Sequence, residues 1–249
     1  LIWPAVAGID RHQIKEKEVM YQYILFDLDG TLTDPKQGIT GCVQYALRRL
    51  GMEAPDADAL EPFIGPPLLD SFQEFCGFDE EKGLQAVAYY RERYAASGWF
   101  ENEAYPGIVE MLARLQKAGC HLAVASSKPE VFVEKILVHF GMRPYFEVVV
   151  GSGLDGSRAR KEEVVEEALR QLLGKDTPAK GTAGNRRDVA MVGDRKFDVK
   201  GAQQFGLASI GVTYGYAAEG ELAEAGADRI VDTVEELAEA LLSGGQAQA

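Results

Sequence analysis

The sequence predicts an α/β protein in which a doubly wound, mostly parallel sheet carries an inserted all-helical domain. Short apolar runs alternate with helical patterns after residue 105, which is the rhythm of parallel strands joined by helices. Two of the apolar runs, 23–26 and 189–192, end close to paired aspartates. The insertion is predicted because residues 36–104 contain only helical patterns.

The first expected strand, residues 23–26, is apolar throughout, as a strand buried on both faces of a parallel sheet must be. Asp27 and Asp29 follow it, and alternation aims both side chains the same way just past its carboxyl end. Paired carboxylates repel unless a cation or a shared proton holds them, so the pair predicts a site for a hard divalent ion, above all Mg²⁺. For this motif alone, an ordinary strand-end turn is the alternative.

Between residues 35 and 105 we expect helices at 38–50, 58–63, 68–76 and 79–97. In the last of these, one helical stripe contains Leu84, Val87, Ala88 and Arg91. The chain therefore divides into a helical domain, 36–104, and a core domain made of 20–35 and 105–249, with hinges near 35–38 and 105–107. Residues 1–19 are expected to be an N-terminal extension.

After residue 105, strands and helices alternate regularly. Expected strands are 120–125, 147–150, 189–192, 207–212 and 229–231, and expected helices are 108–118, 130–140, one that starts at Lys161, one that ends near residue 205, and 234–242. The polar segment 174–187 is expected to be a loop.

Four segments resemble, in order, the motifs of the haloacid-dehalogenase-like phosphohydrolases. They are Asp27-Leu-Asp-Gly-Thr-Leu-Thr-Asp34, the strand that ends in Ser126-Ser-Lys-Pro129, Lys161 at a helix start, and the strand that runs into Asp194 and Asp198. Each segment alone is weak, but four in order make a specific match over roughly residues 21–240. The resemblance implies a Rossmann-like core under a small helical cap. The runs G-T-L-T-D, S-K-P and G-V-T-Y-G-Y resemble the phosphoglycolate-phosphatase-like branch, which also contains predicted nucleotidases.

The resemblance implies a catalytic role for four residues. Asp27 would be the nucleophile that forms an aspartyl-phosphate, and Asp29 would act first as an acid and then as a base. Ser126 would donate its hydroxyl to the transferring group, and Lys161 would add a positive charge suited to phosphate. Without the other motifs, Ser126 reads as a turn or helix cap and Lys161 as a surface residue.

The same resemblance implies a Mg²⁺ site. Its protein ligands would be a carboxylate oxygen of Asp27, the backbone carbonyl of Asp29 and the carboxylate of Asp194. Asp198 would lie one step further out, where it holds metal-bound water or orients Lys161. The alternative for Asp194 and Asp198 is simple capping of the helix that follows.

Four further residues are expected to bind substrate. Backbone N–H groups near Leu28 and Ser127 would contact the transferring group. Gly65 and Pro66 lie in the cap loop expected to select the substrate, because a rigid Gly-Pro-Pro turn could fix a backbone edge over the site. Lys128 could also contact phosphate, but the spacing favours Lys161.

The function expected from this resemblance is a Mg²⁺-dependent phosphatase that acts on a small phosphorylated metabolite, either a phosphoglycolate-like ester or a nucleoside monophosphate. A sugar phosphomutase and an inorganic pyrophosphatase are alternatives within the family. A catalytically idle Mg²⁺-binding regulatory domain is the alternative from another class.

Composition narrows the partners. The 249 residues carry a formal net charge of −13, which disfavours nucleic acid and anionic membrane surfaces as partners. No apolar run is long enough to span a bilayer. The three cysteines are far apart in the sequence, which is typical of a reduced, cytoplasmic chain. The oligomeric state, monomer or homodimer, is not readable.

Overall fold

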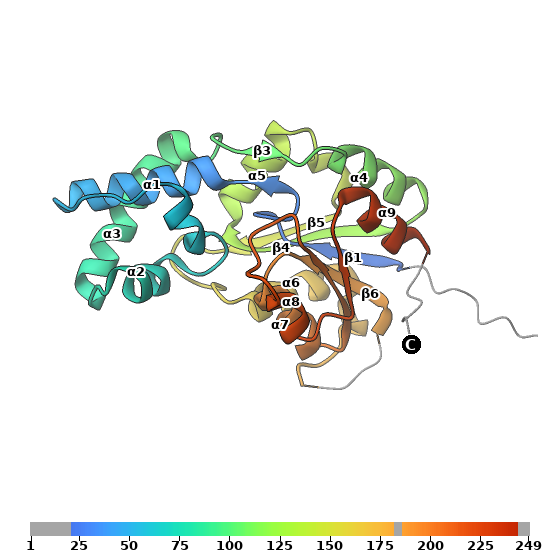
Figure 1. The fold of residues 1–249 in the computed structure, drawn as a ribbon. Helices are drawn as coiled ribbons and strands as arrows, with labels where there is room; N and C mark the ends of the chain where they lie inside the picture. Colours follow the sequence, from blue (N-terminus) through green and yellow to red (C-terminus); the bar gives the residue numbers. More distant parts are fainter. Residues whose placement is uncertain (1–20, 182–185, 244–249) are drawn as a thin grey trace, which may run out of the picture.

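The computed structural model of the chain describes residues 21–181 and 186–243, so the expected N-terminal extension lies outside the described part. At its centre is a six-stranded sheet in the order β5-β4-β1-β6-β7-β8 (Figure 1). Its strands are β1 (Tyr23–Phe26), β4 (His121–Pro129), β5 (Val148–Ser152), β6 (Arg186–Gly193), β7 (Leu207–Val212) and β8 (Arg229–Val231). Every pairing in this sheet is parallel, which confirms the predicted fold class.

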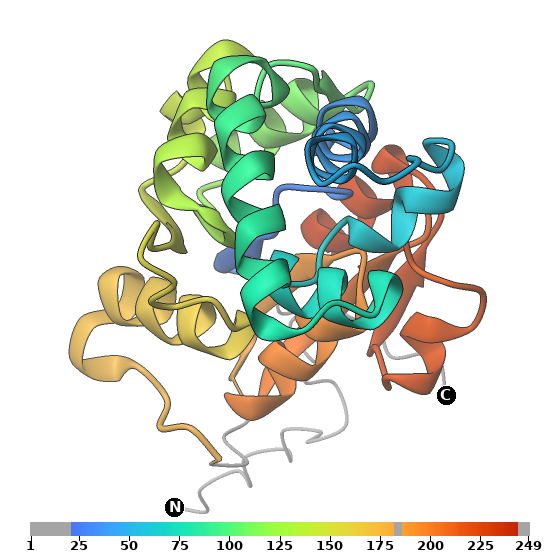
Figure 2. The same ribbon diagram turned by 90° about the vertical axis from the view of Figure 1, so that its left-hand side faces the viewer.

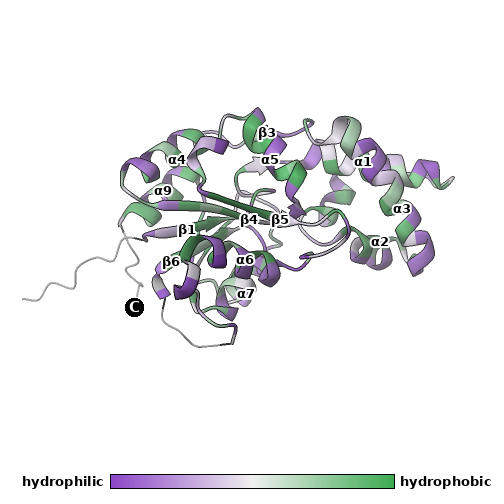
Figure 3. Ribbon diagram, turned by 180° about the vertical axis from the view of Figure 1, so that it is seen from behind, coloured by the Kyte–Doolittle hydropathy of each residue, from purple (hydrophilic) through white to green (hydrophobic). Residues whose placement is uncertain are grey.

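Helices cover both faces of the sheet (Figure 1). One layer contains α4 (Ile108–Lys117), α5 (Glu130–His139) and α9 (Val234–Ser243), and the other contains α6 (Lys161–Leu173) and α7 (Lys196–Gln204). Strand β1 shows why its sequence is apolar throughout. Ile24 and Phe26 pack into the cluster under α4 and α9, whereas Leu25 packs into the cluster under α6. The strands accordingly form the apolar centre of the molecule (Figure 3).

The helical unit stands at one end of the sheet (Figure 2). It contains α1 (Lys36–Arg49), a 3₁₀ helix (Asp58–Phe63), α2 (Leu68–Cys76), α3 (Glu80–Arg93) and a π-helical turn (Tyr94–Gly98). These elements share an apolar cluster, in which Phe72, Val43 and Ala86 are buried and which Phe132 of α5 joins from the core. The two connections to the core pair as a short antiparallel ribbon of β2 (Thr33–Asp34) and β3 (Glu103–Ala104).

The face that α3 buries within the helical unit shares only Val87 with the predicted stripe. The residues buried within the helical unit are Gly83, Ala86, Val87 and Tyr90. Leu84 is 52 % exposed, and Ala88 is also exposed. The helical period predicts which residues share a face of the helix, but it does not predict whether that face packs against other helices or is exposed.

Three other elements differ from the sequence prediction. Residues 58–63 form a 3₁₀ helix rather than an α-helix, and this segment contains Pro62, which has no amide hydrogen to donate. Strand β4 continues to Pro129, four residues beyond its expected end, with a register shift against β5. The expected loop 174–187 includes a 3₁₀ turn, Gly174–Asp176, and the start of β6 at Arg186. A short helix, α8 (Glu221–Glu224), and a 3₁₀ turn, Arg143–Tyr145, complete the described elements.

Cys42, Cys76 and Cys120 are free thiols. Within the described ranges, no helix combines the length and the apolar character needed to cross a membrane.

Candidate active site

The candidate site lies at the carboxyl ends of β1, β4 and β6. Strand β1 lies between β4 and β6, and the chain builds the sheet outward from it on both sides. This is a topological switch point, where open parallel sheets have a crevice that binds ligands. Asp27 follows β1, Ser126 lies in β4, and Asp194 follows β6, so strands distant in sequence bring these side chains to one edge.

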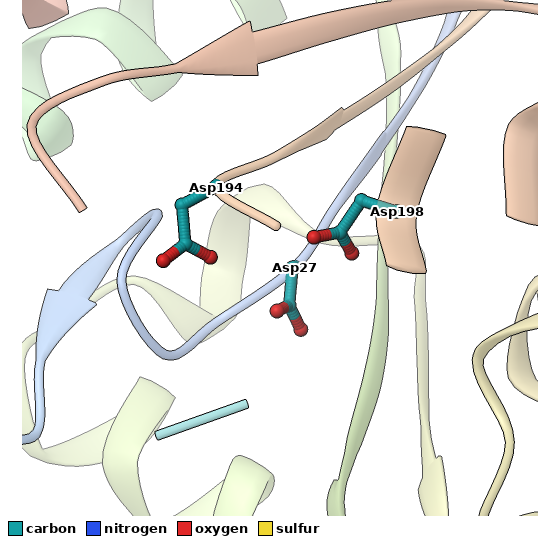
Figure 4. A group of neighbouring side chains, drawn as sticks. All are labelled: Asp27, Asp194 and Asp198. Carbon is teal, nitrogen blue, oxygen red and sulfur yellow. The ribbon is translucent and has the colours of Figure 1, made fainter. Parts of the chain in front are cut away.

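Three buried aspartates form the deepest part of the site. Asp27, Asp194 and Asp198 each offer a carboxylate oxygen, and these three atoms lie within 4.8 Å of one another. Figure 4 shows Asp27 beside Asp194, which follows β6, and Asp198, which lies in the first turn of α7. Burial, followed by the charges of Asp198 and Asp27, raises the pKa of Asp194 well above its usual range. Such a cluster is suited to a cation that removes the mutual repulsion.

Small residues make room for Asp194. A Cβ atom on Gly30 would lie 2.1 Å from Asp194 Oδ2, and one on Gly215 would lie 2.4 Å from its Cβ atom. The backbone N–H of Tyr216 donates to Asp194 Oδ2 at 2.8 Å, while Oδ1 has no hydrogen-bond partner among the described residues. One oxygen of this buried carboxylate is therefore oriented by the protein, and the other is left for a ligand.

Lys161 joins the first and last of the acidic motifs. Its Nζ atom lies 2.9 Å from Asp27 Oδ1 and 2.8 Å from Asp198 Oδ1, and it donates to the carbonyl oxygen of Ala125 at 3.1 Å. Although burial opposes it, the charges of Asp198 and Asp27 raise the pKa of Lys161, so the ammonium form is maintained. The pKa of Asp198 is raised to about 6, chiefly by burial, against the lowering effect of Lys161.

Asp29 is paired with a lysine that the sequence did not favour. Lys128 Nζ forms a buried ion pair with Asp29 Oδ2, and the same ammonium group lies 5.1 Å from the ring centroid of Tyr94 in the helical unit. Burial raises the pKa of Asp29, and Lys128 opposes that rise. Asp29 is thus nearer to holding a proton at neutral pH than an ordinary aspartate, as a general acid requires.

The remaining predicted residues of the core also lie near the acids. Ser126 is 2 % exposed, and its Oγ accepts a 3.4 Å hydrogen bond from the Lys128 backbone, which leaves its own hydrogen free to be donated. Ser127 is partly buried and lines the cavity above the acids. The side chain of Leu28 is buried in the core, so only its backbone is available to a substrate.

The charge balance of the site fits a divalent cation. When they are all ionised, the four buried carboxylates and two buried ammonium groups leave an excess of two negative charges; the groups are Asp27, Asp29, Asp194, Asp198, Lys128 and Lys161. Buried charges must be compensated, and carboxylate oxygens are the ligands preferred by Mg²⁺. The orphaned Asp194 Oδ1 and the cluster with Asp27 therefore fit Mg²⁺ on the chemistry of their donors.

A cavity of about 490 Å³ opens above the acids, between the core and the helical unit. Asp27 and Asp29 lie in its wall, and Gly65 and Pro66 contribute to it from the helical unit. Gly65 has a φ of +105°, a conformation that other residues rarely adopt. The volume is typical of a site for a small organic ligand.

Comparison with known proteins agrees with this geometry. A family model described as haloacid dehalogenase-like hydrolase matches residues 24–212, which include all of the acidic motifs. The chain belongs to this family. The hydrolase resembles the phosphoglycolate-phosphatase-like branch, as the sequence motifs predicted, and it is a phosphoric monoester hydrolase.

Several relatives cover most of the hydrolase. A 5'-nucleotidase of Pseudomonas aeruginosa is 46% identical over 209 residues, which are 84% of this chain and 90% of the relative. A phosphoglycolate phosphatase of Vibrio parahaemolyticus is 30% identical, over 87% of this chain and 94% of the relative. The tyrosine-protein kinase PtkA of Mycobacterium tuberculosis is 40% identical, over 78% of this chain but only 63% of the relative. The crystal structure of a predicted phosphatase from Clostridium acetobutylicum superposes on this chain with a TM-score of 0.81. The two sequences are 46% identical, and the match covers 88% of this chain and 97% of that one.

The sequence favoured Lys161 over Lys128 as a site residue of the hydrolase, and it gave no indication that Arg195 lies near the site. Lys128 contacts Asp29, and the only sequence signal for it is the S-K-P run itself. Arg195 directly follows Asp194 and donates a 2.6 Å hydrogen bond to the carbonyl oxygen of Ile64, next to Gly65. Because its acceptor is a backbone atom, no side-chain pattern could have found that contact.

Proposed function

We propose that the protein is a Mg²⁺-dependent phosphatase that hydrolyses a small phosphorylated metabolite through an aspartyl-phosphate on Asp27. The observation that carries the proposal is the arrangement of Asp27: its carboxylate meets Lys161 on one side and Asp194 and Asp198 on another, and it borders the cavity. A nucleophile so placed has a fixed orientation and a compensated charge.

In the first step, a carboxylate oxygen of Asp27 attacks phosphorus while the bond from phosphorus to the ester oxygen breaks. Asp29 donates its proton to that oxygen, and the alcohol leaves. In the second step, Asp29 takes a proton from water, the water oxygen attacks phosphorus, and the bond to Asp27 breaks, which releases inorganic phosphate. The raised pKa of Asp29 supports the first half of this role.

The other side chains stabilise charge rather than react. Ser126 and the backbone near Leu28 and Ser127 donate to the phosphoryl oxygens, and Lys161 holds Asp27 in the attacking orientation. Mg²⁺, bound by Asp27, the Asp29 carbonyl and Asp194, with Asp198 beside them, would neutralise charge on the phosphoryl group.

We also propose that residues 36–104 act as a cap that excludes water during transfer, with hinges at 35–38 and 105–107. The support is the cavity itself, whose walls come from both units, and the short β2–β3 ribbon that joins the two connections. The relatives named 5'-nucleotidase and phosphoglycolate phosphatase suggest a nucleoside monophosphate or a phosphoglycolate-like ester as substrate.

The proposal is tested by phosphate release from a panel of phosphate esters in the presence and absence of divalent ions. Chelation should abolish turnover, added Mg²⁺ should restore it, and Ca²⁺ should support it poorly because it is larger and less demanding of octahedral geometry. Turnover that survives exhaustive chelation would contradict the metal assignment. Inactivity on every ester would favour a regulatory Mg²⁺-binding domain.

A further inference from the structure

The segment that follows β7, residues 213–216, has no role in the chemistry proposed above, although it lies beside the acids. It contacts Asp194 of the acidic cluster, Asp34 in the first connection to the helical unit, and Tyr105 next to the second connection. A movement of the helical unit about its hinges must pass through these connections. The segment therefore lies where such a movement can reach the acids.

Tyr216 forms hydrogen bonds in two directions. Its backbone N–H donates to Asp194 Oδ2 at 2.8 Å, and its side-chain hydroxyl donates to Asp34 Oδ1. Asp34 belongs to β2 and lies directly before the expected hinge at residues 35–38. Hydrogen bonds to ionised carboxylates are stronger than those between neutral groups, so both contacts restrict the position of Tyr216. One residue thus joins a candidate metal ligand to the hinge.

Asp34 Oδ1 has a second donor on the far side of the hinge. The backbone N–H of Lys36, the first residue of α1, donates to the same oxygen at 2.9 Å. The side chain of Tyr216 also packs against the apolar cluster of the helical unit. If α1 moves with the helical unit, Lys36 moves with it. Both the shared oxygen and the packed ring then change their relation to Tyr216.

The backbone of the segment packs directly on the acids, because Gly215 has no side chain. A Cβ atom on Gly215 would lie 2.3 Å from the carbonyl oxygen of Gly30 and 2.4 Å from the Cβ atom of Asp194. Close-packed groups transmit a displacement rather than absorb it. A displacement of this backbone therefore changes the orientation of the Asp194 carboxylate.

The start of the segment is anchored to the core. The backbone N–H of Thr213 donates to the carbonyl oxygen of Val231 at 3.0 Å, and the hydroxyl of Tyr214 donates to that of Thr31 at 3.0 Å. The ring of Tyr214 packs edge-on against that of Tyr105, with 4.8 Å between the centroids. Because its start is fixed in this way, the contact of the segment with the first hinge depends on Tyr216.

We propose that Tyr216 is a positioning residue that couples the first hinge of the helical unit to the orientation of Asp194. This inference rests on the proposed function, since it assumes that residues 36–104 act as a cap and that Asp194 binds Mg²⁺. Coupling between two sites is reciprocal. A hinge held by Tyr216 favours the metal-binding orientation of Asp194, and a cation at Asp194 favours the held hinge.

The first test measures Mg²⁺ binding to the full chain by calorimetry, without substrate. Tyr216→Phe removes the hydroxyl but keeps the ring and the backbone N–H. It should raise the Mg²⁺ dissociation constant by about tenfold, which is a usual effect of removing a group that orients a metal ligand. Thermal unfolding of the metal-free protein checks that the variant is folded. An unchanged dissociation constant in folded Tyr216→Phe would overturn the inference.

Tyr45→Phe is the matched control for the loss of a tyrosine hydroxyl. Tyr45 also donates to a carboxylate, that of Glu92 at 2.8 Å, but both residues lie within the helical unit. Tyr45→Phe should leave the Mg²⁺ dissociation constant unchanged. A rise equal to that in Tyr216→Phe would show that the effect is not specific to the hinge, and would overturn the inference.

Asp34→Ala tests whether the Tyr216 hydroxyl acts through the hinge. If it does, the double variant Asp34→Ala/Tyr216→Phe should bind Mg²⁺ no more weakly than the weaker-binding single variant, because each change breaks the same link. Effects on the dissociation constant that multiply in the double variant would mean that the two residues act independently. That result would contradict the coupling.

Hydrogen exchange supplies the reciprocal measurement. Mg²⁺ should slow the exchange of the backbone amides at residues 36–40 in the parent, and this protection should be lost in Tyr216→Phe. Equal protection in the two proteins would overturn the inference and leave the phosphatase function intact. A parent that binds Mg²⁺ but hydrolyses no ester would contradict the proposed function, and the dissociation constants would still decide the inference. A parent that binds no Mg²⁺ would overturn both.

Discussion

Arg195 of the core donates from Nη1 to the carbonyl oxygen of Ile64 in the helical unit at 2.6 Å. Arg195 follows Asp194 in the core, whereas Ile64 precedes Gly65 in the helical unit. The guanidinium group also pairs with the buried carboxylate of Glu221, at 2.9 Å, so its position is fixed from the core side. The hydrogen bond therefore ties the Gly65 loop to the residue next to the acidic cluster.

Arg195→Lys should lower kcat/KM by roughly tenfold or more. A lysine can keep the ion pair with Glu221, but it lacks the forked guanidinium group that donates to Glu221 and to the Ile64 carbonyl oxygen at the same time. Thermal unfolding should change little. The control is Glu221→Gln, which keeps the bond to Ile64 but removes the ion pair, and which should lower the melting temperature while kcat/KM stays near that of the parent. The opposite pattern would mean that the Arg195 contact is structural only.

Lys128→Met should move the alkaline limb of the pH profile of kcat/KM to higher pH. Lys128 lowers the pKa of Asp29 against the effect of burial, so its removal raises that pKa, and Asp29 keeps its proton to higher pH. The measurement uses an ester with a poor leaving group, for which protonation matters. Lys135→Met, on the exposed side of α5, is the control for the loss of one charge and should leave the limb in place. An unmoved limb in Lys128→Met would remove Asp29 from the acid role.

Gly38→Ala should destabilise the protein by about 1–3 kcal/mol, because the added Cβ would overpack a close backbone contact. That atom would lie 2.2 Å from the carbonyl oxygen of Gly98 and 2.7 Å from that of Glu101. Gly41→Ala, one turn later in α1, meets only the flexible side chain of Arg93 at 3.3 Å and should be neutral or slightly stabilising. Urea unfolding midpoints compare the two, and equal midpoints would show that α1 can move away from Gly98.

The sequence was sufficient to predict the sheet and the position of its acids. Asp27 and Asp194 each follow an apolar run, and parallel strands present their carboxyl ends at one edge, so their meeting follows from the fold class. The importance of Lys128 could not be predicted in the same way. It depends on the continuation of β4 to Pro129 and on a partner, Asp29, that is 99 residues away.

The helical unit was harder to predict for a different reason. Its helices follow from the periodicity of apolar residues. The face of α3 that carries Leu84, however, lines a cavity, and the sequence pattern does not distinguish an apolar residue that lines a cavity from one in a core. The Arg195 contact with Ile64 was invisible because its acceptor is a backbone carbonyl. The roles of the site residues remain predictions.

Asp27→Asn should abolish turnover without unfolding the protein, since the amide is nearly isosteric but a far poorer nucleophile and a weaker metal ligand. Phosphate release and thermal unfolding are measured side by side. Asp70→Asn, an exposed acid at the cavity wall, is the control and should remain active. More than a small residual fraction of the parent activity in Asp27→Asn would remove Asp27 from the role of nucleophile.

The most direct measurement identifies the phosphorylated residue in the Asp29→Asn variant. With p-nitrophenyl phosphate and Mg²⁺, the leaving group needs no proton, so the first step proceeds, while the second step lacks its base and the intermediate accumulates. Acid quenching during turnover, followed by peptide mass spectrometry, should find the phosphoryl group on Asp27. A phosphoryl group on Ser126 or another residue, or continued turnover with no phosphorylated residue, would contradict the aspartyl-phosphate mechanism.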